Sequence, residues 1–141
     1  MRAVVDTNVV AYYLLGTHPF VDETRQFWQA ADATVAPAIW EAELANVVWM
    51  AIRTGVLPAR EGPKRLDLAA RLGIRSISNR TLWRGALARA LQSGLAVYDT
   101  LFVELARRER LLLATFDKGI LKAFPGVAKR PHALLSIPGP I

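Results

Sequence analysis

The sequence predicts an α/β fold in which a parallel sheet is covered by helices on both faces. Short apolar runs that suit buried strands alternate with longer segments whose apolar residues recur at the helical period. The length of 141 residues suits one domain. No internal repeat, low-complexity region or long linker divides the chain, so we expect a single domain over 1–141.

Five segments are expected as strands, because each is a short run rich in apolar residues. They are Arg2–Val5, Thr34–Ala36, Ile74–Ile77, Leu111–Ala114 and Ala133–Ile137. The run over Leu111–Ala114 is apolar throughout, which is typical of a strand that is buried on both faces.

Helical periodicity and end signals predict the segments between the strands. The longest helix is expected to open at Pro37 and to end before Gly55, since proline favours a helix start and glycine a helix end. The expected helices cover 9–15, 18–31, 37–54, 60–72, 79–93 and 97–109, with a short one that begins at 117.

Composition excludes several classes of site. Cysteine is absent, which excludes disulfides, a thiolate zinc site and a cysteine nucleophile. His18 and His132 adjoin prolines in expected loops, which disfavours a serine triad or a histidine zinc site. No targeting or membrane-spanning segment is recognisable, so we expect a cytoplasmic protein with no membrane partner. The formal net charge of +6 favours phosphate-rich partners.

Two aspartates stand where buried strands are expected to end. Asp6 directly follows Arg2–Val5, and Asp117 follows Leu111–Ala114 after two residues. In open α/β sheets, ligands bind outside the carboxyl ends of the strands. Each aspartate taken alone is better explained as the N-cap of the next helix.

Two further acids occur inside helices, beside apolar residues. Glu43 shares a helix face with Trp40 and Val47, and Asp99 aligns with Phe102 from the first turn of its helix. An inward carboxylate costs free energy unless it is paired or binds a cation, although Asp99 alone also suits the helix dipole. Other acids need no such explanation; Glu104, for example, fits a solvated helix face.

Asp6, Glu43, Asp99 and Asp117 are together predicted to converge on one edge of the sheet, where unpaired carboxylates repel one another. Mg²⁺ or Mn²⁺, which prefer oxygen ligands, would relieve that repulsion. Such an ion polarises a phosphoryl group and activates water, which indicates phosphodiester hydrolysis. Outside these four acids the chain carries 18 basic and 8 acidic residues, a balance that suits a polyanionic substrate.

Four motifs resemble those of the PIN-domain nucleases, in the same order and over nearly the whole chain from Arg2 to about Phe124. They are VVDTNVVAYYLL, WEAELANVVW, YDTLFVELA and LLLATFDKGI. The most similar branch is the VapC-type toxins of toxin–antitoxin pairs. The resemblance implies a three-layer α/β/α sandwich with a short central parallel sheet, and a Mg²⁺- or Mn²⁺-dependent endoribonuclease.

The resemblance also assigns roles to residues and partners. It implies that the four acids are the catalytic metal ligands. It implies that the polar residues around them, Thr7, Asn8, Asn46 and Thr115, support them. A homodimer, an RNA substrate and inhibition by an antitoxin protein are implied as well.

Basic and aromatic residues are less informative. The candidates for RNA contact are Arg80, Arg84, Lys118 and Lys122, whereas we interpret the cluster Arg107, Arg108 and Arg110 as a solvated helix end. The four tryptophans are expected in the core or at a dimer contact. Three hypotheses stay open: a toxin ribonuclease, a PIN-fold module that binds RNA or protein without cleavage, and a housekeeping RNA-processing nuclease.

Overall fold

The computed structural model describes residues 1–136, which form helices and strands in alternation. In chain order the elements are β1 (Arg2–Val5), α1 (Thr7–Leu15), α2 (Val21–Ala30), β2 (Ala33–Pro37), α3 (Ile39–Arg53), the 3₁₀ turn η1 (Ala59–Glu61), α4 (Gly62–Ala70), β3 (Arg75–Ile77), α5 (Asn79–Ser93), α6 (Val97–Glu109), β4 (Leu113–Ala114), α7 (Lys118–Ala123), β5 (Ala128–Lys129) and α8 (Pro131–Leu135).

The five strands form one parallel sheet in the order β3-β2-β1-β4-β5. In the central strand β1, Val4 lies opposite Val35 of β2 and Leu113 of β4. The next pair along the sheet, Val5 and Ala114, is also in register. The carboxyl ends of β1 and β4 therefore lie side by side at the same edge of the sheet, and so do the turns that follow them.

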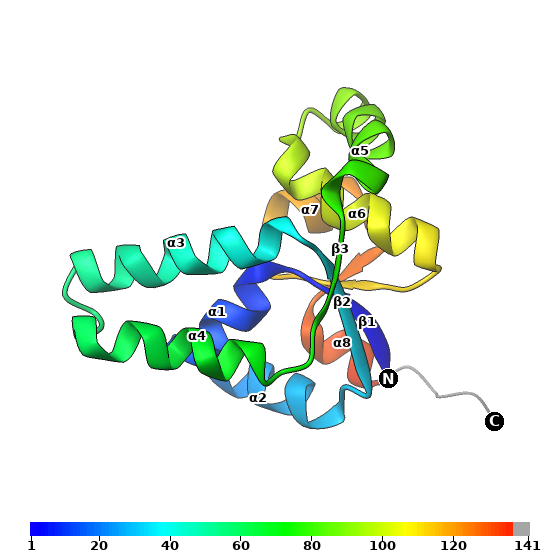
Figure 1. Cartoon of the computed structure of the whole chain (residues 1–141). Helices are drawn as coiled ribbons and strands as arrows, with labels where there is room; N and C mark the ends of the chain where they lie inside the picture. The colour runs from blue at the N-terminus through cyan, green and yellow to red at the C-terminus, as the bar shows by residue number, and fades with distance from the viewer. Residues whose placement is uncertain (137–141) are drawn as a thin grey trace.

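Helices cover both faces of the sheet, as the sequence predicts. The chain moves outward from β1 to β3 through α1–α4 and returns to β4 through α5 and α6. Because parallel crossovers are right-handed, this reversal sends the two sets of helices to opposite faces. Helix α6 contacts β1, β2 and β4, and α5 packs over α6. Figure 1 shows these two helices on the side of the sheet away from α1 and α2.

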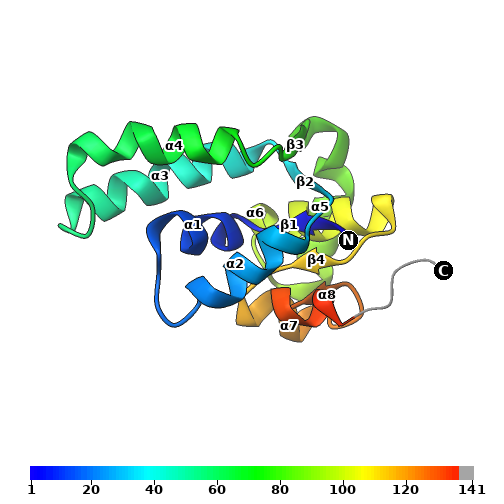
Figure 2. The same cartoon turned by 90° about the horizontal axis from the view of Figure 1, so that it is seen from below.

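Helices α3 and α4 form an antiparallel hairpin that extends beyond the sheet (Figures 1 and 2). A small apolar cluster of Val48, Ala51 and Leu57 lies near the tip of this hairpin. At Gly62 the two helices come close, since a Cβ there would lie 2.8 Å from the Ile52 Cδ1 atom. Both helices of the hairpin also contact α1.

The main core lies between the sheet and its helices. It joins valines of β1 and α1 to large side chains of α2 and α6, with Phe27 and Phe102 at most 1% exposed. The expectation that the tryptophans lie in the core or at a dimer contact is confirmed for the core by Trp40, which is buried. Trp49 and Trp83 are 52% and 53% exposed, so for them a dimer contact stays a prediction. No helix within residues 1–136 is long and apolar enough to cross a membrane.

The structure differs from the expected elements at the start of the long helix and near the end of the described chain. Pro37 is the last residue of β2, and the helix begins at Ile39. The strand expected over Ala133–Ile137 is wrong for the part that the structure describes, because α8 occupies Pro131–Leu135; Ile137 lies outside the described residues. The last strand is β5 instead. A proline at the first helical position and burial of Pro131 and Leu134 on one face favour the helix.

Candidate functional site

Asp6 lies in the turn between β1 and α1 and is the N-cap of α1. One carboxylate oxygen accepts the Thr7 N–H at 2.7 Å. The other accepts the Thr115 hydroxyl at 2.7 Å and a longer hydrogen bond from the Asn8 amide at 3.5 Å. The residue is only 8% exposed. Both explanations of Asp6 from the sequence therefore hold: it caps a helix, and it lies at the carboxyl end of a buried strand.

The turn after β4 is connected to Asp6 by hydrogen bonds. The buried Thr115 hydroxyl donates to Asp6 and accepts the Asp117 N–H at 3.0 Å. Asp117 caps α7 by accepting the Ile120 N–H at 2.9 Å. The Asn8 side-chain oxygen accepts the Phe116 N–H at 3.3 Å. Thr115 thus connects Asp117 to Asp6 directly, and Asn8 connects the neighbouring Phe116 to the same carboxylate.

Glu43 approaches the same edge from α3. It accepts the Thr7 hydroxyl at 2.8 Å, while the Thr7 N–H binds Asp6, so one residue orients two of the acids. Glu43 is partly buried, and its neighbour Glu41 points elsewhere and accepts a hydrogen bond from Ser76. The expectation that Glu43 and Glu41 face different sides of the helix is confirmed.

Asp99 lies in the first turn of α6 and is partly buried. Its charge acts on both Asp6 and Glu43, and the charge of Asp117 acts on Asp99. All four predicted acids are therefore electrostatically connected. They come from three different layers of the fold.

Burial and the repulsion of neighbouring charges make the carboxyl groups of Asp6, Glu43 and Asp99 harder to ionise than usual. Burial raises the pKa of Asp6 to about 7; the hydrogen bonds from Thr115 and Thr7 oppose this, and the charges of Glu43 and Asp99 add to it. Burial also raises the pKa of Glu43, against the Thr7 hydrogen bond, and Asp99 adds to that rise. The pKa of Asp99 is raised by burial and by Asp117.

Hard oxygen donors that repel one another fit a divalent cation by their chemistry. Within residues 1–136, no group of three or more histidine, cysteine, aspartate or glutamate side chains is arranged as a ready-made metal cluster. Mg²⁺ does not need such a cluster, because it keeps several waters and is usually bound through one or two carboxylates plus substrate phosphate. The donor set therefore suits a hydrated ion held between carboxylates.

The structure places the other predicted residues less centrally. Asn46 is exposed on α3, and no hydrogen bond among the described residues joins it to the acids. The four basic candidates are all exposed, on α5 and α7: Arg80, Arg84, Lys118 and Lys122. The Arg80 guanidinium lies 5.5 Å from the centre of the Trp83 ring.

Two neighbours of the acids were missed by reasoning from the sequence. Phe116 donates its N–H to Asn8, and Gly119 leaves little room beside Asp117, because an added Cβ would lie 3.2 Å from a carboxylate oxygen. The only available signal was their position within the fourth motif, LLLATFDKGI. A phenylalanine or a glycine has no chemistry that marks it in a single sequence.

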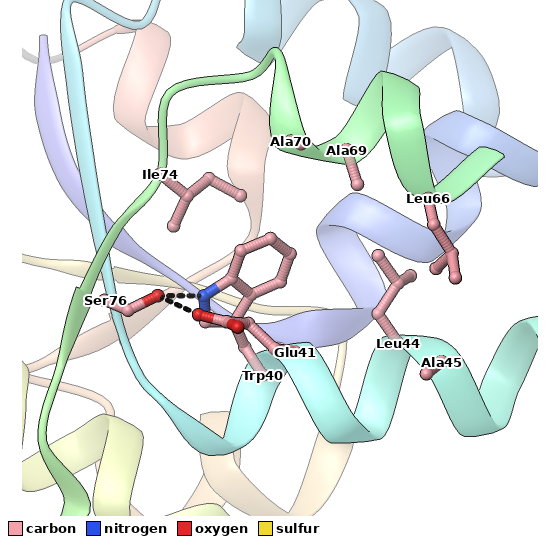
Figure 3. A pocket seen from close by; sticks show the side chains of 9 residues that line it. All are labelled: Trp40, Glu41, Leu44, Ala45, Leu66, Ala69, Ala70, Ile74 and Ser76. Carbon is pink, nitrogen blue, oxygen red and sulfur yellow. Dashed lines mark hydrogen bonds between the residues drawn. The ribbon is translucent and has the colours of Figure 1, made fainter. Parts of the chain in front are cut away.

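A cavity of about 380 Å³ lies elsewhere, between α3, α4 and β3 (Figure 3). Its walls include Leu44, Leu66 and Ile74, and at one end the Trp40 indole donates to Ser76, which donates to Glu41. It is mainly apolar and none of the four acids lines it. The acidic site is instead at the carboxyl edge of the sheet.

Comparison with known proteins agrees with this architecture. The family model for the PIN domain matches residues 3–125. Ribonuclease VapC3 of Pyrobaculum aerophilum is 28% identical over 130 residues, which are 90% of this chain and 98% of that protein.

Solved structures share the fold at low identity. A toxin–antitoxin complex from Klebsiella pneumoniae aligns with a TM-score of 0.65 and 20% identity, over 92% of this chain and 97% of that one. VapBC2 from Rickettsia felis, bound to a DNA fragment from its promoter, aligns with a TM-score of 0.63 and 15% identity, over 92% and 98%. The family match covers most of the sequence and includes all four acids, and this chain belongs to the PIN-domain family.

Proposed function

We propose that this protein is a Mg²⁺- or Mn²⁺-dependent endoribonuclease, the toxin of a toxin–antitoxin pair. The observation that carries the proposal is the group of four coupled acids at the carboxyl edge of the sheet, with the pKa of Asp6 raised to about 7. A carboxylate whose ionisation is opposed by burial and by neighbouring negative charge gains a favourable partner when a cation binds. Membership of the PIN family and the similarity to a protein named Ribonuclease VapC3 support RNA as the substrate.

In this proposal, Asp6, Glu43, Asp99 and Asp117 hold the cation. When bound, the ion supplies a Lewis acid for the phosphoryl oxygens and a water of lowered pKa. Thr115 keeps one oxygen of Asp6 in place and Thr7 orients Glu43, so both hydroxyls act through the carboxylates.

The basic residues extend the proposed site toward the RNA. Lys118 directly follows Asp117, and Lys122 lies one turn further on the exposed side of α7. We assign both to phosphate contacts, together with Arg80 and Arg84 on α5. These contacts position the RNA backbone and carry no sequence specificity by themselves.

An antitoxin partner, a homodimer and a cytoplasmic location belong to the same proposal, and the solved structures of similar proteins support the antitoxin partner. Two of the similar solved structures are described as a toxin–antitoxin complex and as VapBC2. The exposed apolar side chains of α5, which include Trp83, Leu87 and Leu91 at four-residue spacing, offer a surface for a second copy.

The test is cleavage of a panel of structured and single-stranded RNAs by purified, partner-free protein with Mg²⁺ or Mn²⁺. We expect cleavage that stops in EDTA and in the Asp6→Asn variant. Asp67→Asn, an exposed acid on α4, is the matched control and should cut like the wild type. Equal cleavage in EDTA would exclude the metal-dependent mechanism. RNA binding without any cleavage by the wild type would favour the non-cutting binding module.

A further inference from the structure

Phe116 lies between the two residues of the β4–α7 turn that serve the site, Thr115 and Asp117. Its ring is 8% exposed and packs against Tyr12 and Phe20, with ring centres 5.3 and 5.0 Å away. The mechanism above gives the ring no role. Close packing around the ring nevertheless restrains the Phe116 Cα atom, and with it the backbone that leads to Thr115 on one side and to Asp117 on the other.

Arg130, the residue between β5 and α8, covers this ring. The guanidinium carbon lies 4.8 Å from the centre of Phe116 and 5.8 Å from that of Phe20. The preceding residue, Lys129 of β5, accepts the Thr115 N–H at 3.0 Å through its carbonyl oxygen. The neighbouring residues Lys129 and Arg130 therefore contact the turn in two ways, through the backbone hydrogen bond of Lys129 and through the side chain of Arg130 over Phe116. A guanidinium stacked on an aromatic face is a favourable contact.

Glu23 of α2 holds the guanidinium in place. The Arg130 Nε donates to one carboxylate oxygen at 3.3 Å and one terminal nitrogen donates to the other at 2.6 Å. The His132 N–H also donates to Glu23, at 3.1 Å. Burial alone would raise the pKa of Glu23, but the hydrogen bonds from Arg130 and His132 outweigh it and leave the pKa below its usual value. Glu23 thus stays ionised and fixes the plane of the arginine fork.

We propose that Arg130 is a positioning residue for the reaction. Glu23 holds its guanidinium over the Phe116 ring, and this contact fixes the turn that presents Thr115 and Asp117. The inference rests on the proposed function, since it names a residue that acts on the same site. In this arrangement Arg130 acts through Phe116 and does not contact the RNA.

Arg130→Ala and Arg130→Lys test the proposal against a closely matched control, Arg107→Ala. Arg107 makes the same two-pronged contact, with Glu104, at 3.1 and 2.8 Å, on the opposite end of α6 from Asp99. We expect Arg130→Ala to lower kcat for RNA at least about tenfold with KM within about twofold, because small misplacements of reacting groups are costly. Arg107→Ala should lower the melting temperature and leave the kcat of the folded protein unchanged.

Arg130→Lys keeps the charge and loses the planar fork, so we expect it to behave like Arg130→Ala. In a Phe116→Leu background, removing Arg130 should cause no further loss of kcat, because the aromatic contact through which it acts is already gone. Restoration of kcat by lysine would show that the charge matters and not the stacked plane. A raised KM with an unchanged kcat would show direct contact with RNA. Either result overturns the proposal.

Hydrogen exchange gives a measurement that does not depend on activity. The amides of Asp117 and Ile120 are both hydrogen-bonded within the turn. We expect them to exchange at least about tenfold faster in Arg130→Ala, but not in Arg107→Ala, since local opening becomes easier where the support is lost. Unchanged exchange at both amides overturns the positioning role. If the wild type cuts no RNA, the proposed function fails by itself, and exchange still decides the role of Arg130.

Discussion

Replacing Asp6 by asparagine should change how the stability of the cation-free protein depends on pH. The pKa of this carboxyl is about 7 in the folded protein against an ordinary value of 3.8. A raised pKa means that the folded state holds the proton more tightly than the unfolded state does. The stabilisation is complete below pH 4 and is lost as the pH rises toward and through 7. In EDTA the wild type should therefore become less stable from acid to neutral pH.

The size of the effect follows from the two pKa values. Each pH unit between them corresponds to about 1.4 kcal/mol, so ionising Asp6 in the folded protein costs at most about 4 kcal/mol in total. Between pH 5 and pH 8 the share of this cost is about 2 to 3 kcal/mol. Asparagine has nearly the same shape and does not titrate. The free energy of unfolding of Asp6→Asn should therefore lack this part of the pH dependence.

Urea unfolding of both proteins, followed by circular dichroism in EDTA at several pH values, measures the difference. Between pH 5 and pH 8, we expect the free energy of unfolding of the wild type to fall by about 2 to 3 kcal/mol more than that of Asp6→Asn. Saturating Mn²⁺ should remove the loss, because the ion stabilises the ionised form. Parallel curves for the two proteins in EDTA would refute the argument that burial makes Asp6 hard to ionise.

Three further changes separate the site from the structural parts of the fold. Thr115→Val removes the hydroxyl that donates to Asp6 and accepts from Asp117, so the rate of RNA cleavage should fall at least about tenfold while circular dichroism shows a folded protein. Gly85→Ala places a methyl group 2.2 Å from the carboxylate of Glu104, where the two groups overlap. Urea unfolding should therefore show that the free energy of unfolding falls by about 2 kcal/mol or more. Glu104→Gln weakens the contacts with its arginines and should lower stability by about 1 to 3 kcal/mol, with the kcat of the folded protein unchanged.

The sheet and the acids at its edge were predictable because they depend on local patterns. A buried strand followed by an aspartate and a helix specifies both the direction of the chain and the place of the carboxylate. Asp6 and Asp117 needed no more than that, and the capping bonds and strand ends agree with it. The inward direction of Glu43 followed from helical spacing, which its contact with Thr7 confirms.

The role of Glu104 could not be predicted, and its assignment to a solvated face is wrong. The side chain is 0% exposed, packs where Gly85 of α5 leaves space, and binds Arg107 and Arg108. Burial by itself opposes ionisation, but the hydrogen bonds from the two arginines outweigh it and lower the pKa of Glu104. The space comes from a glycine 19 positions earlier, and helical periodicity carries no information about contacts between helices.

The strand expected over Ala133–Ile137 was predicted wrongly for a different reason. Apolar residues in a run as short as Ala133–Leu135 fit a strand and a helix equally well by period alone. The decision is made by packing, because α8 lies against α2, where Glu23 also binds the Arg130 side chain and the His132 N–H. The two-residue strand β5 gives almost no pattern by itself and forms because β4 lies beside it.

In the proposed function, carboxylates at the edge of the sheet hold the ion that drives RNA cleavage. The most direct measurement is the rate of RNA cleavage as a function of Mn²⁺ concentration, for the wild type and for Asp99→Asn. We predict that the wild-type rate saturates with Mn²⁺ and vanishes in EDTA. The variant should need at least about tenfold more Mn²⁺ to reach half of its own maximum, since it loses one of the charges that attract the ion. An identical Mn²⁺ dependence in the two proteins, or cleavage that persists in EDTA, would contradict the account.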